Sequence, residues 1–278
     1  MEPIMKWAGG KRQLIPALER YFDREALFEG RNRYFEPFIG GGALFFYIEP
    51  HNAVINDFNP ELINVYEVIR DSPRDLIEIL RLHQANYTHD YYIHIRSMDR
   101  RAGFNDLPQV ERAARIIFLN KTCYNGLYRV NNNGYFNVPI GQQDNPDIVM
   151  ADKIYAMSNY FNNNDIVLRR GDFEAAVFDA QPGDVIYFDP PYDYEKTGFT
   201  SYNQNTFGRN DLERLKQLSD NLVDIGCTVI LSNNDTPFVN ELFREYAIEH
   251  IDAKRFINCD GTKRRNGKEV IIYGNRQL

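Results

Sequence analysis

The stretch Phe35-Glu36-Pro37-Phe38-Ile39-Gly40-Gly41-Gly42-Ala43 runs from an apolar segment directly into three consecutive glycines. A short apolar run closed by a glycine-rich turn is typical of a buried parallel strand whose end lies beside a ligand. Glycine suits such a turn because it has no Cβ to keep the backbone away from the ligand. A purely structural strand-to-helix turn is the alternative, and the glycine spacing differs from that of a dinucleotide-binding loop.

Four further apolar runs are predicted to be strands, and each ends in a polar turn. They are residues 53–58, 166–168, 184–189 and 227–232. Helical segments are predicted at residues 43–48 and 210–225. This alternation predicts an α/β fold with a doubly wound, mostly parallel, Rossmann-like sheet, in which ligands bind at the carboxyl ends of the strands.

The interval between the second strand and the next one is long and mostly helix-like. It contains helix-like pieces at residues 72–86 and 108–119, followed by a turn around residues 131–134. Such an interval is too long for a loop between a strand and a helix. We therefore predict an inserted, mostly helical domain at residues 65–160 that carries a hairpin. The core domain would then comprise residues 1–64 and 161–278.

Composition excludes some classes of protein but does not indicate a specific function. The chain has 278 residues, 43% of them hydrophobic, which is enough for a packed core. It has no apolar run long enough to span a membrane, and its three cysteines form neither a metal cluster nor a disulfide framework, so we expect a cytoplasmic protein without a bound metal. The net charge of -7 does not exclude nucleic acid, because phosphate binding depends on where the basic residues lie.

Acidic residues at two strand ends indicate a nucleoside cofactor. Asp57 ends the second strand, where a carboxylate can accept hydrogen bonds from ribose hydroxyls. A helix cap before Pro60 is an equally good interpretation of Asp57 alone. Asp172 and Phe173 follow residues 166–168 and suit the amino group and ring of an adenine. With the glycine-rich turn, three strand ends favour the cofactor.

The tetrad Asp189-Pro190-Pro191-Tyr192 directly follows an apolar strand. Two prolines cannot continue a central strand, so the chain must leave the sheet in a stiff turn. An Asp carboxylate and the Pro190 carbonyl would then be two adjacent acceptors for the two N–H donors of an exocyclic amine. Accepting both would direct the nitrogen lone pair at an electrophilic methyl group, and Tyr192 offers a face on which an extruded base can stack.

In this order, the motifs resemble the α group of Dam-type DNA adenine methyltransferases, and the resemblance covers essentially the whole chain. Lys6-Trp7-Ala8-Gly9-Gly10-Lys11 is similar to the N-terminal signature of that family. The resemblance implies methyl transfer from S-adenosylmethionine to the N6 amine of adenine in double-stranded DNA. The residues it implies for cofactor binding are Trp7, Lys11, Glu36, Gly40, Gly42, Asp57, Asp172, Phe173 and Asp189.

Residues 120–129 and 134–139 resemble the DNA-recognition hairpin of the same family. The resemblance implies that Arg129 reads a guanine and that Tyr124 fills the space left by the flipped adenine, within a GATC target. A hairpin with no partner is the structural alternative. The residues expected to contact DNA are Lys6 and, in these segments, Tyr124, Asn125, Leu127, Arg129 and Pro139. We also expect Lys263 and Arg264 to contact DNA, because they lie in a basic run at residues 263–268, for which a solvated face is the structural alternative.

Several alternative functions remain open from the sequence. Methylation of cytosine C5 is disfavoured because no cysteine lies near a suitable motif. The tetrad also occurs in N4-cytosine and RNA-base methyltransferases, and a DNA-binding regulator with a degenerate catalytic domain is a further alternative. A nucleotide oxidoreductase is a more distant one, because no second dinucleotide-binding half is visible. We expect a monomer, with any cognate restriction endonuclease acting without direct contact.

Overall fold

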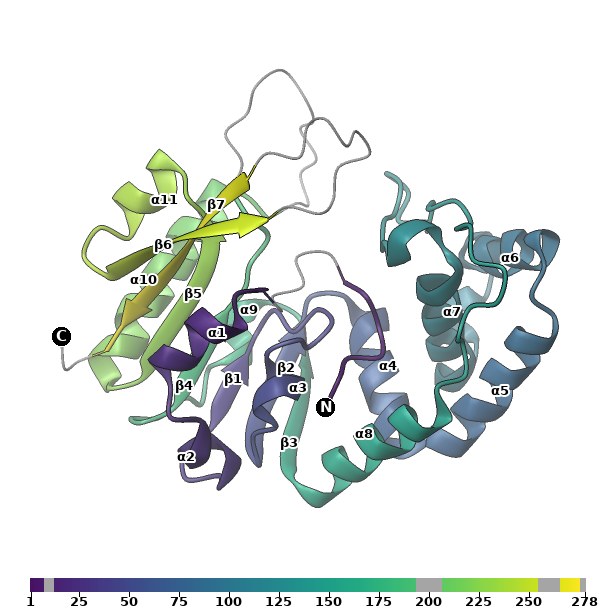
Figure 1. Cartoon of the computed structure of the whole chain (residues 1–278), viewed down its shortest axis with the longest axis horizontal. Coiled ribbons are helices and arrows are strands. Elements are labelled where there is room, and N and C mark those ends of the chain that lie inside the picture. Colours follow the sequence, from purple (N-terminus) through teal and green to yellow (C-terminus); the bar gives the residue numbers. More distant parts are fainter. Residues whose placement is uncertain (8–12, 194–206, 255–265, 276–278) are drawn as a thin grey trace. The chain divides into compact units, whose positions relative to one another are not determined.

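A computed structural model describes residues 1–7, 13–193, 207–254 and 266–275 (Figure 1). In this part of the chain a seven-stranded sheet has the order β3-β2-β1-β4-β5-β7-β6. The strands are β1 (Tyr34–Glu36), β2 (Asn52–Asp57), β3 (Asp165–Arg170), β4 (Val185–Phe188), β5 (Thr228–Asn234), β6 (Ala247–Lys254) and β7 (Asn266–Gly274).

Helices connect most of these strands. They are α1 (Ile15–Leu18), α2 (Arg24–Phe28), α3 (Phe45–Ile48), α4 (Pro60–Asp71), α5 (Pro73–Ala85), α6 (His89–Arg96), α7 (Gln109–Thr122), α8 (Ala151–Asn163), α9 (Phe173–Ala176), α10 (Arg209–Ile225) and α11 (Pro237–Leu242). Short 3₁₀ turns occur at Glu19–Tyr21, Ser97–Arg100, Phe104–Asp106 and Tyr124–Gly126.

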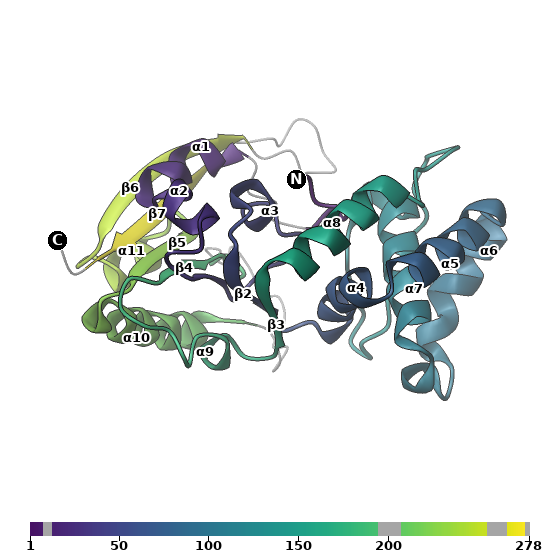
Figure 2. The same ribbon diagram turned by 90° about the horizontal axis from the view of Figure 1, so that it is seen from below.

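The sheet is parallel at its centre and antiparallel at one edge. Strand β1 pairs in parallel with β2 and with β4, and β4 pairs in parallel with β5. Strand β7 is antiparallel to both β5 and β6. Figure 2 shows α1 and α2 on one side of β4 and β5, and α9 and α10 on the other. The predicted α/β class, with a doubly wound and mostly parallel sheet, is confirmed.

The chain divides into two compact units. The first comprises Met1–Lys11, Ile39–Glu49 and Asn56–Gly171, and the second comprises Arg12–Phe38, Pro50–Ile55 and Asp172–Leu278. The predicted boundaries of the insertion, residues 65 and 160, fall inside α4 and α8. A separate DNA-recognition domain at residues 65–160 therefore stays a prediction, and the bounds of these helices are the ones that the structure provides.

Helix α10 packs one apolar stripe against the sheet of the second unit. Its buried residues Leu212, Leu215 and Leu222 lie on one face, as helical periodicity requires. They join a core that includes Ile186 of β4 and Leu231 of β5. The helix ends at Gly226, whose φ of 101° lies in the left-handed region that favours glycine at this position.

Helix α7 is the central helix of the first unit. Most of its length is buried, including Ala113, Ile117 and Phe118. A helix that is buried on nearly every side must be surrounded by other elements. Here α4, α5 and α6 contact it (blue to teal in Figure 1), which gives this unit a helical core.

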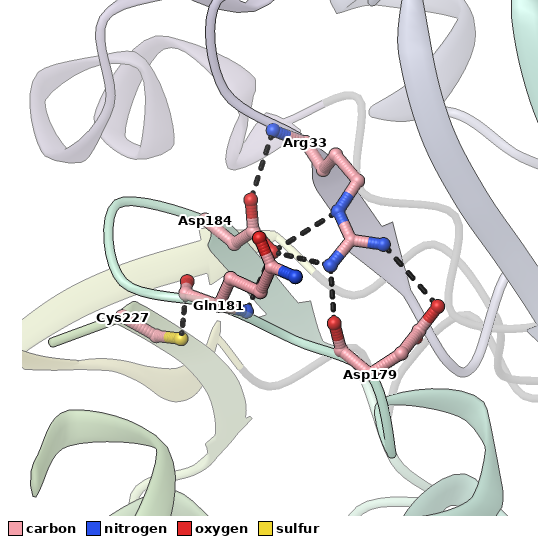
Figure 3. A network of polar contacts seen from close by, with 5 residues as sticks. All are labelled: Arg33, Asp179, Gln181, Asp184 and Cys227. Atoms are coloured by element: carbon pink, nitrogen blue, oxygen red, sulfur yellow. Dashed lines mark hydrogen bonds and ion pairs between the residues drawn. The ribbon is translucent and has the colours of Figure 1, made fainter. Parts of the chain in front are cut away.

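A polar network ties together the starts of the three central strands of the second unit (Figure 3). Arg33, which precedes β1, donates from Nε and Nη2 to one carboxylate oxygen of Asp184, at 3.2 and 3.0 Å. It also reaches the side chain and the carbonyl of Asp179. The backbone N–H of Gln181 donates to Asp184, and the Cys227 thiol donates to the Gln181 carbonyl. Residues 33, 184 and 227 directly precede β1, β4 and β5, so this network helps to fix the start of each strand.

We expect Arg33→Leu to lower the free energy of unfolding by about 1.5–3 kcal/mol, the size of a lost hydrogen bond to a charged group. The substitution leaves the buried Asp184 carboxylate without its cation. Chemical denaturation measures the effect. The exposed pair of Arg20 with Glu249 supplies the control, because Arg20→Leu should cost only about 0–1 kcal/mol. Equal effects of the two substitutions would contradict the assigned role of Arg33.

Candidate active site

Asp57 fastens the glycine-rich turn to the end of β2 within the first unit. Its carboxylate accepts hydrogen bonds from the backbone N–H of Gly40 at 3.1 Å and of Asn59 at 2.9 Å. Burial raises the pKa of Asp57, and these N–H donors counteract part of the rise. The N-cap of α4 is Asn59, whose side chain accepts from the N–H of Glu61. Capping by Asp57, the structural alternative considered from the sequence, is therefore wrong.

Trp7 lies directly on the glycine-rich turn. A Cβ placed on Gly40 would come within 2.8 Å of the Trp7 ring, so only glycine allows this contact. The indole also stacks on Tyr128, with ring centroids 5.0 Å apart. Gly42 has a φ of 71° and packs equally closely against Phe46. Of the residues expected at the cofactor end, Lys11 lies outside the described residues.

The predicted recognition hairpin is an irregular antiparallel loop. It is held by two isolated bridges, Cys123 with Ile140 and Val130 with Phe136, and the structure assigns no regular strand to this described segment. Asn125, two residues after the Cys123–Ile140 bridge at the base of this loop, takes a left-handed conformation at φ 56°. Side chains of this loop that were expected to contact DNA are largely exposed: Tyr124, Asn125, Arg129 and Pro139 are exposed, and Leu127 is half-buried. Lys263 and Arg264 lie outside the described residues.

Donors from α6 and from the adjacent 3₁₀ turn support this loop from beneath. Tyr92 and Arg96 donate to the Val138 carbonyl at 2.8 and 3.3 Å, and Arg100 donates to the Phe136 carbonyl at 3.1 Å. The Phe136 N–H in turn donates to a side-chain oxygen of Asp99, which also pairs with the buried Arg115. The loop is thus anchored to the helical core of the first unit.

Asn120, at the end of α7, joins the N-terminal segment to the same loop. It accepts from the Lys6 N–H at 2.9 Å and donates to the Lys6 carbonyl at 2.7 Å and to the Gly126 carbonyl at 3.0 Å. Lys6, expected to contact DNA, is therefore held against the hairpin with its side chain exposed. Arg129 is also held, because its Nε donates to the Asn137 side chain at 2.7 Å.

The tetrad begins where β4 ends, in the second unit. Asp189 is half-buried, and its carboxylate accepts a hydrogen bond from the Ser232 hydroxyl at 2.9 Å. Tyr187 lies 2.9 Å from the same hydroxyl. Pro190 is buried and Pro191 is exposed, so the chain turns outward between them. The predicted abrupt exit from the sheet is what the structure has.

Tyr192 is fixed by its hydroxyl, which donates to Glu269 of β7 at 3.1 Å. Burial raises the pKa of Tyr192 well above its usual value, with a further contribution from Asp189, so the hydroxyl stays protonated and remains a donor. Glu36, at the end of β1, is buried and accepts from the Tyr34 hydroxyl at 2.7 Å. The carboxylates of Asp189, Glu269 and Glu36 thus each accept a hydrogen bond from a serine or tyrosine hydroxyl.

The residue after the tetrad is held by the polar end of β5 and by the residues that follow it. Asp193 donates from its N–H to the side-chain oxygen of Asn233 at 2.9 Å, and its carboxylate accepts from Thr236 at 2.9 Å. Asn234 donates to the Asp193 carbonyl, and Arg209 at the start of α10 pairs with the Asp193 carboxylate. The side-chain nitrogen of Asn233 is buried and has no partner among the described residues.

Asp172 and Phe173 have structural contacts of their own. Asp172 caps α9 through the N–H of Glu174 and pairs with Arg214 at 3.1 Å. Phe173 is only 4% exposed, stacks on Phe38 with centroids 5.5 Å apart, and has the Arg214 guanidinium 4.9 Å from its ring centre. Contact of this pair with an adenine stays a prediction, and in this structure little of the Phe173 ring is accessible.

Sequence reasoning did not identify three features of these sites. Asn120 is the first residue of the predicted recognition segment 120–129, but no role was predicted for it. The run from Ser232 to Thr236 follows a predicted strand and is entirely polar, which is a usable signal once β5 is known to lie beside β4. Phe58 is 74% exposed directly after Asp57, and an exposed aromatic at a strand end is the kind of surface that a purine can stack on.

The sheet order is that of a doubly wound α/β fold, in which ligands bind at the carboxyl ends of the strands. Residues 7–257 match the family model of the D12 class N6 adenine-specific DNA methyltransferases. The chain belongs to this family. It is an adenine-specific DNA methyltransferase, and DNA is its substrate.

Relatives cover nearly the whole chain. It is 45% identical over 279 residues to the type II methyltransferase M1.LlaDCHI of Lactococcus lactis subsp. cremoris, covering 99% of this chain and 96% of that one. It is 31% identical to a DNA adenine methylase of Haemophilus influenzae, with coverage of 99% and 94%. Identity to the DNA N-6-adenine-methyltransferase of Escherichia phage P1 is 33%, covering 96% of this chain and 35% of the phage protein.

The family match answers two questions that the tetrad left open. Adenine is favoured over cytosine N4 and over RNA bases, and an enzyme is favoured over a degenerate regulator. In the described residues no helix is long and apolar enough to cross a membrane.

Proposed function

We propose that this methyltransferase takes its methyl group from S-adenosylmethionine and acts at GATC in double-stranded DNA. It extrudes the target adenine and receives it at the tetrad of residues 189–192. The observation that carries the proposal is the half-buried Asp189 carboxylate directly after β4, which accepts a hydrogen bond from Ser232 and is followed by two prolines that have no backbone N–H. We further propose a monomer, and the type II names of relatives support a role in a restriction–modification pair.

The end of β2 and the glycine-rich turn fit the nucleoside part of this cofactor. Asp57 is an acid whose carboxylate is oriented by two N–H donors, and an ionised carboxylate has capacity to accept further hydrogen bonds from ribose hydroxyls. The bare backbone of Gly40 allows close approach, and Phe58 offers an exposed ring to a purine. When bound, S-adenosylmethionine would supply an electrophilic methyl group on a sulfonium.

The tetrad would prepare the adenine amine for attack. Asp189 and the Pro190 carbonyl would accept its two N–H groups, which draws the nitrogen lone pair out of conjugation with the ring. The Tyr192 ring, oriented through Glu269, would stack on the base. Correct alignment can supply about 7–11 kcal/mol of the barrier reduction without covalent catalysis. No nucleophilic side chain is needed for this chemistry.

The exposed side chains of the recognition loop would read the flanking bases. A guanidinium at Arg129 can fork to O6 and N7 of a guanine, and the apolar Leu127 and Pro139 suit a thymine methyl group. Extruding the adenine costs roughly a few kcal/mol, and the exposed Tyr124 ring would offset part of this cost by filling the gap.

We expect Asp57→Ala to weaken S-adenosylmethionine binding by about 1.5–3 kcal/mol, the size of a hydrogen bond to a charged group. Because the pKa of Asp57 is raised, binding should also weaken on acidification at a higher pH than an ordinary aspartate would cause. Titration calorimetry measures both effects. Asp57→Asn keeps an acceptor for the Gly40 N–H and serves as the control for folding. Unchanged affinity in Asp57→Ala would remove Asp57 from the cofactor site.

The function is tested with labelled S-adenosylmethionine, a GATC duplex and the same sequence as RNA. Labelled N6-methyladenine should form in the DNA duplex and not in the RNA. Duplexes with each single-base change in GATC should be poorer substrates. Equal labelling of all duplexes would overturn the GATC assignment, and the absence of labelled N6-methyladenine from the GATC duplex would overturn the cofactor assignment.

A further inference from the structure

The turn of residues 189–192 has few backbone hydrogen-bond donors. Pro190 and Pro191 lack backbone N–H groups, so two of its four residues cannot donate hydrogen bonds to hold its shape. Proline fixes φ but leaves the position of the flanking side chains undetermined. The contacts that set the Asp189 carboxylate must therefore come from elsewhere in the fold.

The polar end of β5 supplies these contacts on both sides of the turn. Ser232 donates to Asp189 before the prolines. After them, Asn233 and Asn234 bond the backbone of Asp193, and Thr236 bonds its carboxylate. Strands β4 and β5 are parallel neighbours, with Phe188 paired with Leu231, so the residues that follow each strand come side by side.

Ser232 is the residue of this group that touches the reacting carboxylate, and the direction of its hydrogen bonds is determined. A hydroxyl has one proton, and Ser232 gives it to Asp189. At the 2.9 Å contact with Ser232, Tyr187 is then the donor. The sequence of donors is Tyr187 to Ser232 to Asp189. Ser232 is 0% exposed and Tyr187 is 1% exposed, so both hydroxyls are shielded from water.

We propose that Ser232, itself held by Tyr187, is a positioning residue for methyl transfer that fixes the Asp189 carboxylate for the adenine amine. This inference rests on the proposed role of Asp189. A donor to one carboxylate oxygen limits rotation of the group about its Cβ–Cγ bond and stabilises its ionised form. Both effects serve a carboxylate that must accept a hydrogen bond from an amine.

Several other charged or titratable groups face this network. They are Tyr34 and Glu36 of β1, Tyr192 of the tetrad and Glu269 of β7. Burial raises the pKa of Tyr187, and the carboxylates of Asp189, Glu36 and Glu269 raise it further, which keeps Tyr187 protonated as the first donor. Removing the Ser232 donor in this acidic setting makes Asp189 easier to protonate.

The test compares Ser232→Ala with Tyr187→Phe and with Ser219→Ala. Ser219 is an equally buried serine of α10 that bonds the Leu215 carbonyl, so Ser219→Ala repeats the change without touching the tetrad. Single-turnover rates are measured at saturating DNA and S-adenosylmethionine across a range of pH. Binding affinities and thermal denaturation are measured for each variant.

Ser232→Ala should lower the rate of methyl transfer by about 10- to 100-fold. A loss of this size is typical when a hydrogen bond that orients a functional side chain, here the Asp189 carboxylate, is removed. The pH below which the rate falls should rise, and affinities for DNA and cofactor should stay unchanged. Tyr187→Phe removes the donor to Ser232 but keeps the ring and the hydrogen bond from Ser232 to Asp189, so it should cause a smaller change in the same direction. If Ser232→Ala does not fold, Tyr187→Phe still tests whether this hydrogen-bond network positions Asp189.

Wild-type rates and pH profiles in Ser232→Ala and Tyr187→Phe would overturn the inference. A loss of the same size in Ser219→Ala would also overturn it, because the effect would then come from general packing. Asp189→Ala separates this failure from failure of the proposed function. If Asp189→Ala is inactive while Ser232→Ala is normal, only the positioning role is lost, whereas an active Asp189→Ala removes the catalytic assignment itself.

Discussion

Asp189→Ala should abolish detectable methyl transfer while the protein remains folded. The substitution removes one of the two acceptors for the adenine amine, so the nitrogen lone pair stays conjugated with the ring. Loss of a single preorganised hydrogen bond to a reacting group costs about 100- to 1000-fold in rate. Here the alignment of the amine is lost as well, because the remaining acceptor is the Pro190 carbonyl alone. Transfer of labelled methyl groups to a duplex under single-turnover conditions measures the effect.

Asp224→Ala is the matched control for this prediction. Asp224 lies exposed near the end of α10, and its removal should leave the rate unchanged. Circular dichroism and thermal denaturation check that both variants are folded. Substantial residual transfer by Asp189→Ala would contradict the role given to the tetrad, even if binding of DNA and cofactor were normal.

Arg129→Ala should relax discrimination at one guanine of the target by about 1–3 kcal/mol. Arg129 is exposed in the recognition loop and is held by Asn137, so its guanidinium is positioned before DNA arrives. A guanidinium has five N–H donors, and the two that bond Asn137 leave others for a base. Rates on every single-base variant of GATC, at fixed salt, measure the effect.

Lys263→Ala provides the comparison. A lysine that contacts phosphate should weaken binding about equally on all sequences and flatten the dependence on salt. The two classes of contact therefore give different patterns across the same set of duplexes. A uniform loss in Arg129→Ala, with no relaxation at any guanine, would make Arg129 a phosphate-contacting or structural residue.

The central strands could be predicted because each is a short apolar run that ends in a polar or glycine-rich turn. Residues 33–38 and 184–189, for example, contain β1 and β4. Strands β6 and β7 were not predicted. Their antiparallel pairing is recognised only after folding, although the consecutive buried residues Val270, Ile271 and Ile272 of β7 were an available signal. The bounds of α4 and α8 show a further limit, since the predicted edges of the insertion fall within these helices.

Some residues of the candidate site can be predicted from the local sequence, whereas others depend on contacts between distant parts of the chain. Asp57, Asp189 and the glycines stand at strand ends and were identified from local sequence. The role of Ser232 depends on β5 lying beside β4, and a Ser-Asn-Asn run is also common in any turn. The packing of Phe173 between Phe38 and Arg214 likewise depends on partners distant in the chain.

The most direct test of the account is to map modified bases on a plasmid that the purified enzyme has methylated with S-adenosylmethionine. Single-base mapping should find N6-methyladenine within GATC on both strands, and Asp189→Ala should produce none. N4-methylcytosine, or N6-methyladenine spread over sites without a common GATC, would contradict the account of how this chain selects and methylates its target.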